Sequence, residues 1–266
     1  MTRPIGVFDS GIGGLTVVRE VVKELPGESL VFLGDTARVP YGTRGEAVIT
    51  RFAEELTRFL LARDVKYLVA ACNTISSTCL EVIEAASPVP VVGVVRPAVR
   101  EAVALTRTGR IGVIGTRATV ASGAYEREIG RLAPGAEVIS RACPLFVPLA
   151  EEGLTHAEAT RLIARDYLEG LAGSGIDVLV LGCTHYPLLR DVIQETVGPA
   201  VRLVDSAKPT ARELAARLRD AGLLDEAAAP EYDLLVTDAP QRTGEIARAF
   251  FGGDLPGVLR QAALPP

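Results

Sequence analysis

The chain has 266 residues, of which 48% are hydrophobic and 23% charged, with 26 Gly and 17 Pro. This composition is typical of a globular protein and excludes a disordered or collagen-like chain. The 28 basic and 33 acidic residues give a net charge of −5. We expect no nucleic-acid partner, because phosphate backbones are bound by one-sided basic surfaces. No apolar stretch approaches the ~18–20 residues of a membrane-spanning helix, so we expect a cytoplasmic protein with no membrane partner.

Short, continuously apolar runs alternate with longer amphipathic stretches along the chain. The runs predict strands at residues 5–8, 30–33, 67–70, 89–95, 111–114, 136–139, 178–181 and 201–204. The stretches predict helices at residues 15–25, 45–63, 76–86, 122–132, 157–171 and 209–221. Continuous apolar character is typical of strands that are buried on both faces. Strands alternating with helices therefore predict an α/β fold with open, mostly parallel sheets.

An internal repeat relates the two halves of the chain. The strand before Cys72 resembles the strand before Cys183, which lies 111 residues later. The first strand likewise resembles the apolar run at 111–114, which lies 106 residues later. Strands and a cysteine thus follow in the same order twice, which predicts two similar, pseudo-symmetric domains of the flavodoxin-like type.

The repeat also predicts where the domains begin and end. We assign residues 1–97 and 207–266 to the first domain and residues 98–206 to the second, with a hinge near Arg96-Pro97. Open α/β sheets bind ligands outside the carboxyl ends of their strands. Two such edges that face each other would enclose one active site between the domains.

A glycine-rich motif follows the first strand and precedes a helix. It reads Asp9-Ser10-Gly11-Ile12-Gly13-Gly14. Backbone N–H groups at such a helix start bind anions, although the glycines could instead serve only a tight turn. A dinucleotide fingerprint would need Gly at position 16, which is Thr16. The carboxylate of Asp9 suits an ammonium group, so the motif predicts a site for a zwitterion.

Four cysteines are too few and too scattered for a disulfide scaffold, so we expect free thiols. Cys79 and Cys143 have no polar companions and are expected to be packing residues. Cys72 and Cys183 end the repeat-related strands and are followed by hydrogen-bonding residues. Such neighbours can shift a thiol pKa and orient a substrate.

The residues after the two repeat-related cysteines differ. Asn73-Thr74 follows the first, and Thr184-His185 follows the second. Imidazole changes its charge near neutral pH, so His185 could set the pKa of the neighbouring thiol or donate to the substrate, with a purely structural histidine as the alternative. His156 lies in a polar helix start and is expected at the surface.

Two other kinds of cysteine chemistry fit the sequence less well. Zinc would need a closer ligand pair than Cys72 and Cys79, and the chain has no C-x-x-C and only two histidines, so we expect no metal. A Cys-His hydrolase needs a single nucleophile and leaves the second cysteine unexplained. A reaction that removes a proton from one face of a carbon and returns it on the other uses two such groups.

Four segments together resemble glutamate racemase. They are Asp9-Ser10-Gly11-x-Gly13-Gly14, Gly34-Asp35 with Pro40-Tyr41-Gly42, Cys72-Asn73-Thr74, and Gly182-Cys183-Thr184-His185-Tyr186-Pro187-Leu188-Leu189. The His after Cys-Thr separates the sequence from the similar aspartate racemases, which usually have Glu there. The resemblance implies a two-domain, usually dimeric enzyme that racemises glutamate without a cofactor and supplies D-glutamate for peptidoglycan.

The resemblance also implies roles for individual residues. Cys72 would deprotonate D-glutamate and Cys183 L-glutamate, assisted by Asp9 and His185 respectively. The implied substrate contacts are Asp9, Ser10, Tyr41, Gly42, Asn73, Thr74, Thr184 and His185. Two further acidic positions, Asp35 and Glu151, match the family without a settled role.

One residue departs from the family pattern, and two alternative functions stay open. Arg96 stands where many relatives have an acidic or apolar residue, and at an interdomain position it could alter closure or regulation. The enzyme could act on another small acid as a racemase, isomerase or decarboxylase, or the chain could be a non-catalytic amino-acid-binding protein. Pyridoxal phosphate is not expected, because Lys23, Lys66 and Lys208 lie away from the matched strand ends, with Lys208 near Asp205-Ser206 as the one alternative.

Overall fold

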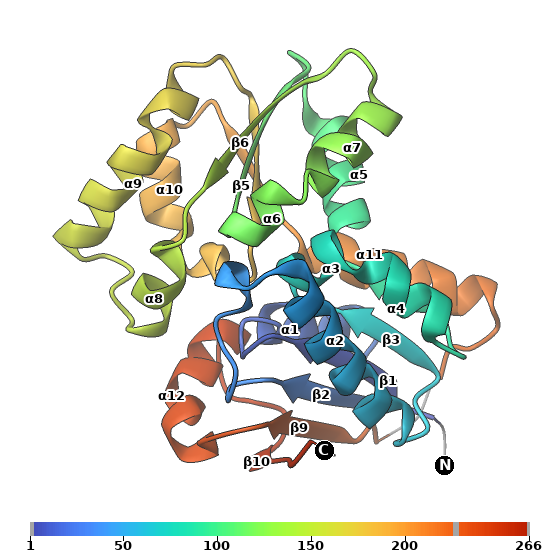
Figure 1. Cartoon of the computed structure of the whole chain (residues 1–266). Helices are drawn as coiled ribbons and strands as arrows, with labels where there is room; N and C mark the ends of the chain where they lie inside the picture. Colours follow the sequence, from blue (N-terminus) through green and yellow to red (C-terminus); the bar gives the residue numbers. More distant parts are fainter. Residues whose placement is uncertain (1–2, 226–228, 265–266) are drawn as a thin grey trace.

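The computed structural model of the chain describes residues 3–225 and 229–264. The chain forms two sheets of parallel strands, each covered by helices (Figure 1). The first sheet has the order β10-β9-β2-β1-β3-β4 and the second β6-β5-β7-β8, with every neighbouring pair parallel. The strands are β1 (Ile5–Asp9), β2 (Leu30–Gly34), β3 (Tyr67–Ala70), β4 (Val91–Gly93), β5 (Arg110–Gly115), β6 (Glu137–Ala142), β7 (Val178–Gly182), β8 (Arg202–Asp205), β9 (Tyr232–Val236) and β10 (Leu259–Gln261).

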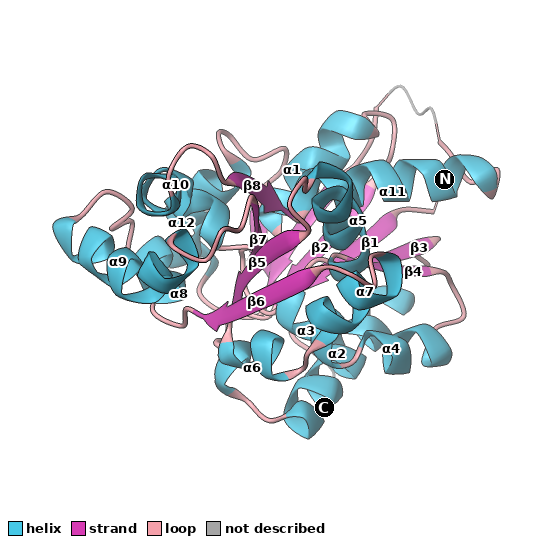
Figure 2. Cartoon of the chain, turned by 90° about the horizontal axis from the view of Figure 1, so that it is seen from above, coloured by secondary structure: helices cyan, strands magenta, loops and turns pink. Residues whose placement is uncertain are grey.

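We call the first sheet and its helices the first lobe, and the second sheet and its helices the second lobe. The first lobe contains α1 (Leu15–Glu24), η1 (Tyr41–Thr43), α2 (Glu46–Leu61), α3 (Asn73–Thr78), α4 (Leu80–Ala86), α11 (Ala207–Asp220) and α12 (Pro240–Phe251). The second contains α5 (Val95–Leu105), α6 (Arg117–Ala121), α7 (Ala124–Leu132), α8 (Phe146–Glu151), α9 (Glu158–Ala172), η2 (Tyr186–Leu189) and α10 (Arg190–Val197). Figure 2 shows α9 and α10 on one side of the second sheet and α5 and α7 on the other.

The same strand order occurs in both lobes. Strands β2-β1-β3-β4 of the first sheet correspond to β6-β5-β7-β8 of the second, and Cys72 and Cys183 follow the corresponding strands β3 and β7. The predicted α/β fold with two similar open sheets is therefore confirmed. The domain boundaries at residues 97 and 206 stay a prediction.

Burial on both faces explains why the strands read as continuous apolar runs. Along β1, Ile5 and Val7 pack into one core cluster with α1 and α11, whereas Phe8 packs into another cluster with residues of α2. All five residues of β1 are buried. Each buried apolar side chain contributes roughly 1.5–3 kcal/mol to folding, so helices on both faces of the sheet are required.

Three of the predicted elements are wrong in their extent. The strand expected at 89–95 is only β4, because Val95 already begins α5, whose first turn accommodates Pro97 where a missing N–H costs nothing. The helix expected at 76–86 is two helices that meet at Cys79, whose φ of −140° is not helical. The helix expected from residue 122 begins at Ala124, after Gly123 with a φ of 62°.

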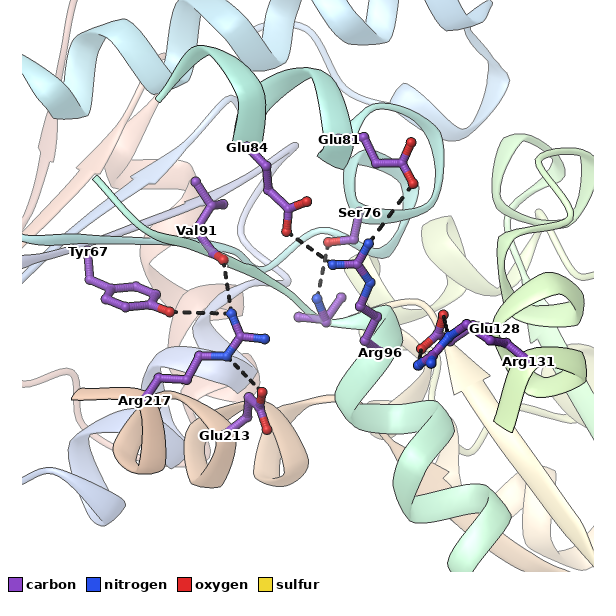
Figure 3. A network of polar contacts seen from close by, with 11 residues as sticks. Tyr67, Ser76, Glu81, Glu84, Val91, Arg96, Glu128, Arg131, Glu213 and Arg217 are labelled. Atoms are coloured by element: carbon purple, nitrogen blue, oxygen red, sulfur yellow. Dashed lines mark hydrogen bonds and ion pairs between the residues drawn. The ribbon is translucent and has the colours of Figure 1, made fainter. Parts of the chain in front are cut away.

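Polar side chains join the two lobes on the side of α4 and α7 (Figure 3). Arg96, in the first turn of α5, reaches across to Glu84 of α4 at 3.3 Å, close to the Glu128–Arg131 pair of α7. Arg96 thus lies at the junction of the lobes. The pair is partly exposed, so it contributes no more than about 1 kcal/mol to stability.

Across residues 3–225 and 229–264, none of the helices combines the length and the apolar character needed to cross a membrane.

Candidate active site

A cavity of about 510 Å³ lies between the lobes, and both repeat-related cysteines line it. Its size falls within the ~300–1,000 Å³ of small-molecule sites. Its wall also contains Ser10, Tyr41, Gly42, Asn73, Thr74, Glu151, Thr184 and His185. A larger cavity of about 640 Å³ lies beside Arg96, but of the four cysteines only Cys79 lines it. The cavity with two thiols is therefore the candidate active site.

Cys72 is a buried thiol of the first lobe. It directly precedes α3, so the strand β3 and the helix together fix its direction. Its Sγ lies 3.3 Å from Ser10 Oγ. Burial, with the nearby charge of Asp9, raises the pKa of Cys72 to about 12. Cys72 is consequently a protonated thiol near neutral pH.

Asp9 lies next to this thiol but does not line the cavity. It is fully buried at the end of β1, where its Oδ2 accepts a hydrogen bond from the Gly11 N–H at 3.0 Å. Its Oδ1 has no hydrogen-bond partner among the described residues. Burial raises the pKa of Asp9, against the opposing effect of the His185 charge. An unpaired buried oxygen beside a thiol is suited to accept or return a proton.

Cys183 has a different environment in the second lobe. Its Sγ lies 3.8 Å from Nδ1 of His185, and Nε2 of His185 lies 2.9 Å from Oε1 of Glu151 in α8. Burial lowers the pKa of His185, but its contacts with Cys183 and Glu151 outweigh burial and raise the pKa to about 10. An imidazolium beside a cysteine favours the thiolate. The two thiols of the cavity thus have neighbours of opposite charge.

Asn73 presents an unused donor to the cavity. Its Oδ1 accepts hydrogen bonds from Tyr125 Oη at 2.8 Å and from Ser206 Oγ at 2.9 Å. These two bonds fix the amide so that Nδ2 is left without a partner among the described residues, in a side chain that lines the cavity. A buried amide without an acceptor is destabilising unless a ligand provides one. The arrangement suits a carboxylate of the ligand.

A cluster of three threonines lies beside Asn73. Thr74 Oγ1 is 3.0 Å from Thr116 Oγ1 and 3.3 Å from Thr119 Oγ1. Thr116, which lines the cavity, and Thr119 were not predicted from the sequence. The repeat could have identified Thr116, because it follows Ser10 by the same 106 residues that separate β1 from β5.

The loop with Tyr41 and Gly42 forms another part of the wall. Asp35 lies behind this loop rather than in the wall, and accepts hydrogen bonds from Tyr41 Oη, from Arg38 Nε at 2.6 Å and from Thr237 Oγ1 at 2.9 Å. Asp35 therefore fixes the position of Tyr41. A Cβ on Gly42 would lie 2.5 Å from Thr116 Cβ, so glycine allows the two lobes to approach here.

The remaining predicted residues lie outside the cavity. Cys79 and Cys143 are buried in core clusters and His156 is exposed, as predicted. In the glycine-rich motif, the Gly11 N–H is used by Asp9, and a Cβ on Gly14 would lie 2.6 Å from the Asp9 Cβ. Close packing in a tight turn therefore explains these two glycines better than an anion cradle does. The described ranges contain no group of three or more His, Cys, Asp or Glu side chains arranged to hold a metal.

The sequence and the fold both match known proteins. Residues 5–214 match the family model of Asp/Glu/hydantoin racemases. The glutamate racemase of Geobacter metallireducens is 51% identical over 259 residues, which are 97% of this chain and 96% of the relative. That of Chlorobium phaeobacteroides is 51% identical over 257 residues, 96% of this chain and 94% of the relative.

Solved structures agree with these relatives. A glutamate racemase isoform of Bacillus anthracis superposes with a TM-score of 0.95 at 36% identity, covering 99% of this chain and 98% of the other. The glutamate racemase of Francisella tularensis, solved in complex with D-glutamate, gives 0.93 at 37% identity with the same coverage.

Proposed function

Since the chain belongs to the Asp/Glu/hydantoin racemase family and, within it, to the glutamate racemases, we propose that it interconverts L- and D-glutamate by two-base proton transfer between Cys72 and Cys183. The observation that carries this proposal is the single cavity lined by two thiols from opposite lobes. Inversion at a carbon needs one group to remove the proton from one face and another to deliver a proton to the opposite face.

The different environments of the thiols support this mechanism. With a proton on Cys72 and a charged imidazole beside Cys183, Cys72 can act as the acid and Cys183 as the base toward L-glutamate. Cys183 takes the α-proton, and the electron pair left on Cα forms a bond to the proton of Cys72. Cys183 then carries a proton and Cys72 is a thiolate, which is the state that begins with D-glutamate.

The α-proton of an amino acid is far less acidic than a thiol, so the cavity must stabilise the developing negative charge. Asn73 Nδ2 and the threonine hydroxyls donate to the α-carboxylate, where charge accumulates in the transition state. Asp9, behind the cavity wall, assists Cys72, and His185 with Glu151 assists Cys183. Tyr41, held by Asp35, and Gly42 lie near the side-chain carboxylate.

We further propose that the reaction needs no cofactor, that the enzyme is a cytoplasmic homodimer, and that its D-glutamate enters peptidoglycan. The two thiols with their neighbours supply both proton transfers, which makes an electron sink such as pyridoxal phosphate unnecessary. Among the lysines, Lys66 is buried against Glu28 at 2.6 Å and Lys208 is exposed.

Replacement of each thiol tests the proposal. Cys72→Ser and Cys183→Ser should each lower the rate of racemisation by about 10²–10⁴-fold, the usual contribution of a general acid or base. Cys79→Ala, which removes a buried thiol outside the cavity, should keep the wild-type rate. Polarimetry with cofactor-free protein measures the rates. Full activity in either cavity variant would contradict the two-base mechanism.

The same assay separates the alternatives. A racemase of another small acid would turn over aspartate at least as fast as glutamate. A non-catalytic binding protein would bind glutamate without changing its optical rotation, and its binding would not depend on the thiols.

A further inference from the structure

His185 follows a strand of the second lobe, but two residues of the first lobe pack against its ring. The imidazole is 5% exposed. One contact comes from Gly13 in the turn between β1 and α1, and another from Phe250 in α12. The ring centroids of His185 and Phe250 are 4.8 Å apart, and the rings are inclined at 72°. The acid/base pair of one lobe is thus packed against the other.

The contact at Gly13 leaves no room for a side chain. A Cβ built there would lie 2.2 Å from Thr184 Oγ1 and 2.7 Å from Nδ1 of His185, closer than a Cβ approaches other atoms. Gly13 does not have the left-handed φ that would by itself favour glycine. The close approach therefore explains glycine at this position.

Hydrogen bonds hold the turn that carries Gly13. Its carbonyl accepts hydrogen bonds from the Thr16 N–H at 3.0 Å and from Thr16 Oγ1 at 2.8 Å. Phe250 is fully buried in the core cluster that also contains Ile12 and the buried apolar residues of α1. Both contacts with His185 thus come from the packed part of the first lobe.

We propose that Gly13 and Phe250 are positioning residues that hold the His185 imidazole against Cys183 from the opposite lobe. The inference rests on the proposed function for its purpose. A charged imidazole kept in contact with a thiol favours the thiolate, which is the form that removes the α-proton.

Few titratable groups act on the charge of the Cys183–His185 pair. Those that act on His185 are Cys183 on its own segment, Glu151 of α8 and Asp9 at the end of β1. Gly13 and Phe250 carry no charge. Their replacement therefore changes the pair through position alone.

Alkylation of the whole protein by iodoacetamide between pH 6 and 9, followed by peptide mapping, measures the thiolate at Cys183. The pH midpoint of the rate reports ionisation independently of how easily the reagent enters. Cys72, Cys79 and Cys143 react little in this range, because burial raises their pKa values to about 12, 11 and 12. Each thiol is identified by its own peptide.

Gly13→Ala should raise the midpoint at Cys183 by at least one pH unit, which is a tenfold lower thiolate fraction below the midpoint, and racemisation of both enantiomers should fall in parallel. Gly45→Ala is the matched control, since a Cβ at Gly45 meets nothing within 4 Å, and should leave the midpoint unchanged. Circular dichroism and thermal unfolding establish that the variants are folded.

Phe250→Leu tests the contact between Phe250 and His185 without introducing a steric clash. If Gly13→Ala does not fold, the result for Phe250→Leu decides whether the inference holds. It should raise the midpoint by at least half a pH unit. Folded variants with a wild-type midpoint at Cys183 would overturn the inference, even if wild-type protein racemises glutamate. A wild-type protein that fails to racemise would instead overturn the proposed function, while the midpoints would still report on the pair.

Discussion

Two residues of the same type have opposite tasks in this cavity because their neighbours differ. Cys72 lies beside a buried carboxylate, and Cys183 beside an imidazole that is itself paired with Glu151. Negative charge next to the first thiol opposes its ionisation, whereas positive charge next to the second supports it. Neighbours that favour different charge states of two groups are typical of an acid and a base acting together.

The pKa of His185 leads to a prediction about stability. It is raised from 6.5 to about 10 in the folded chain, so the contacts of the imidazolium stabilise the fold fully below about pH 6.5 and lose this effect as the pH rises through 10. His185→Gln should therefore lower the free energy of unfolding on the order of a few kcal/mol at pH 6 and progressively less toward pH 10.

Urea unfolding at pH 6, 8 and 10 measures this difference. His156→Gln, which replaces the exposed histidine, should show no comparable loss at any of these pH values. A difference between wild type and His185→Gln that grows with pH would contradict the assigned charge state.

Whether a strand could be predicted from the sequence depended on its apolar run. Runs of four or more apolar residues predicted β3 and β7 to within one residue at either end. Strand β9 was not predicted, although Leu234, Leu235 and Val236 are buried, because its apolar run has only these three residues. The edge strand β10 has three residues, and two of them, Arg260 and Gln261, are exposed. It was not predicted, because it contains no apolar run. Helix α5 was missed because its first residue, Val95, continues the apolar run of β4.

Helical glycines provide a prediction for single elements. Gly170 lies exposed in the last turns of α9, and a Cβ there meets nothing within 4 Å, so Gly170→Ala should stabilise the protein by about 0.5–1 kcal/mol. Gly198 ends α10 with a φ of 86°, which an alanine tolerates poorly, so Gly198→Ala should destabilise by a similar amount. Thermal unfolding of the two variants measures both changes, and shifts of the same sign would contradict the backbone argument.

At the scale of the molecule, function depends on bringing two equivalent sheet edges together. The repeat in the sequence predicted which cysteines end corresponding strands, and the structure places both in one cavity. It could not predict Thr119, or that Asp35 lies behind Tyr41, because these contacts depend on how the lobes and loops pack. The role of Gly13 against His185 is likewise a contact between segments that are far apart in the chain.

The central claim is that two different groups remove and deliver the proton. The most direct measurement is the distribution of deuterium when wild-type protein converts a small fraction of L-glutamate in D₂O. The account predicts that the D-glutamate formed carries deuterium at Cα, delivered by exchanged Cys72, while the remaining L-glutamate keeps its proton. Product that retains the proton of the substrate, or equal labelling of both enantiomers from the start, would contradict it.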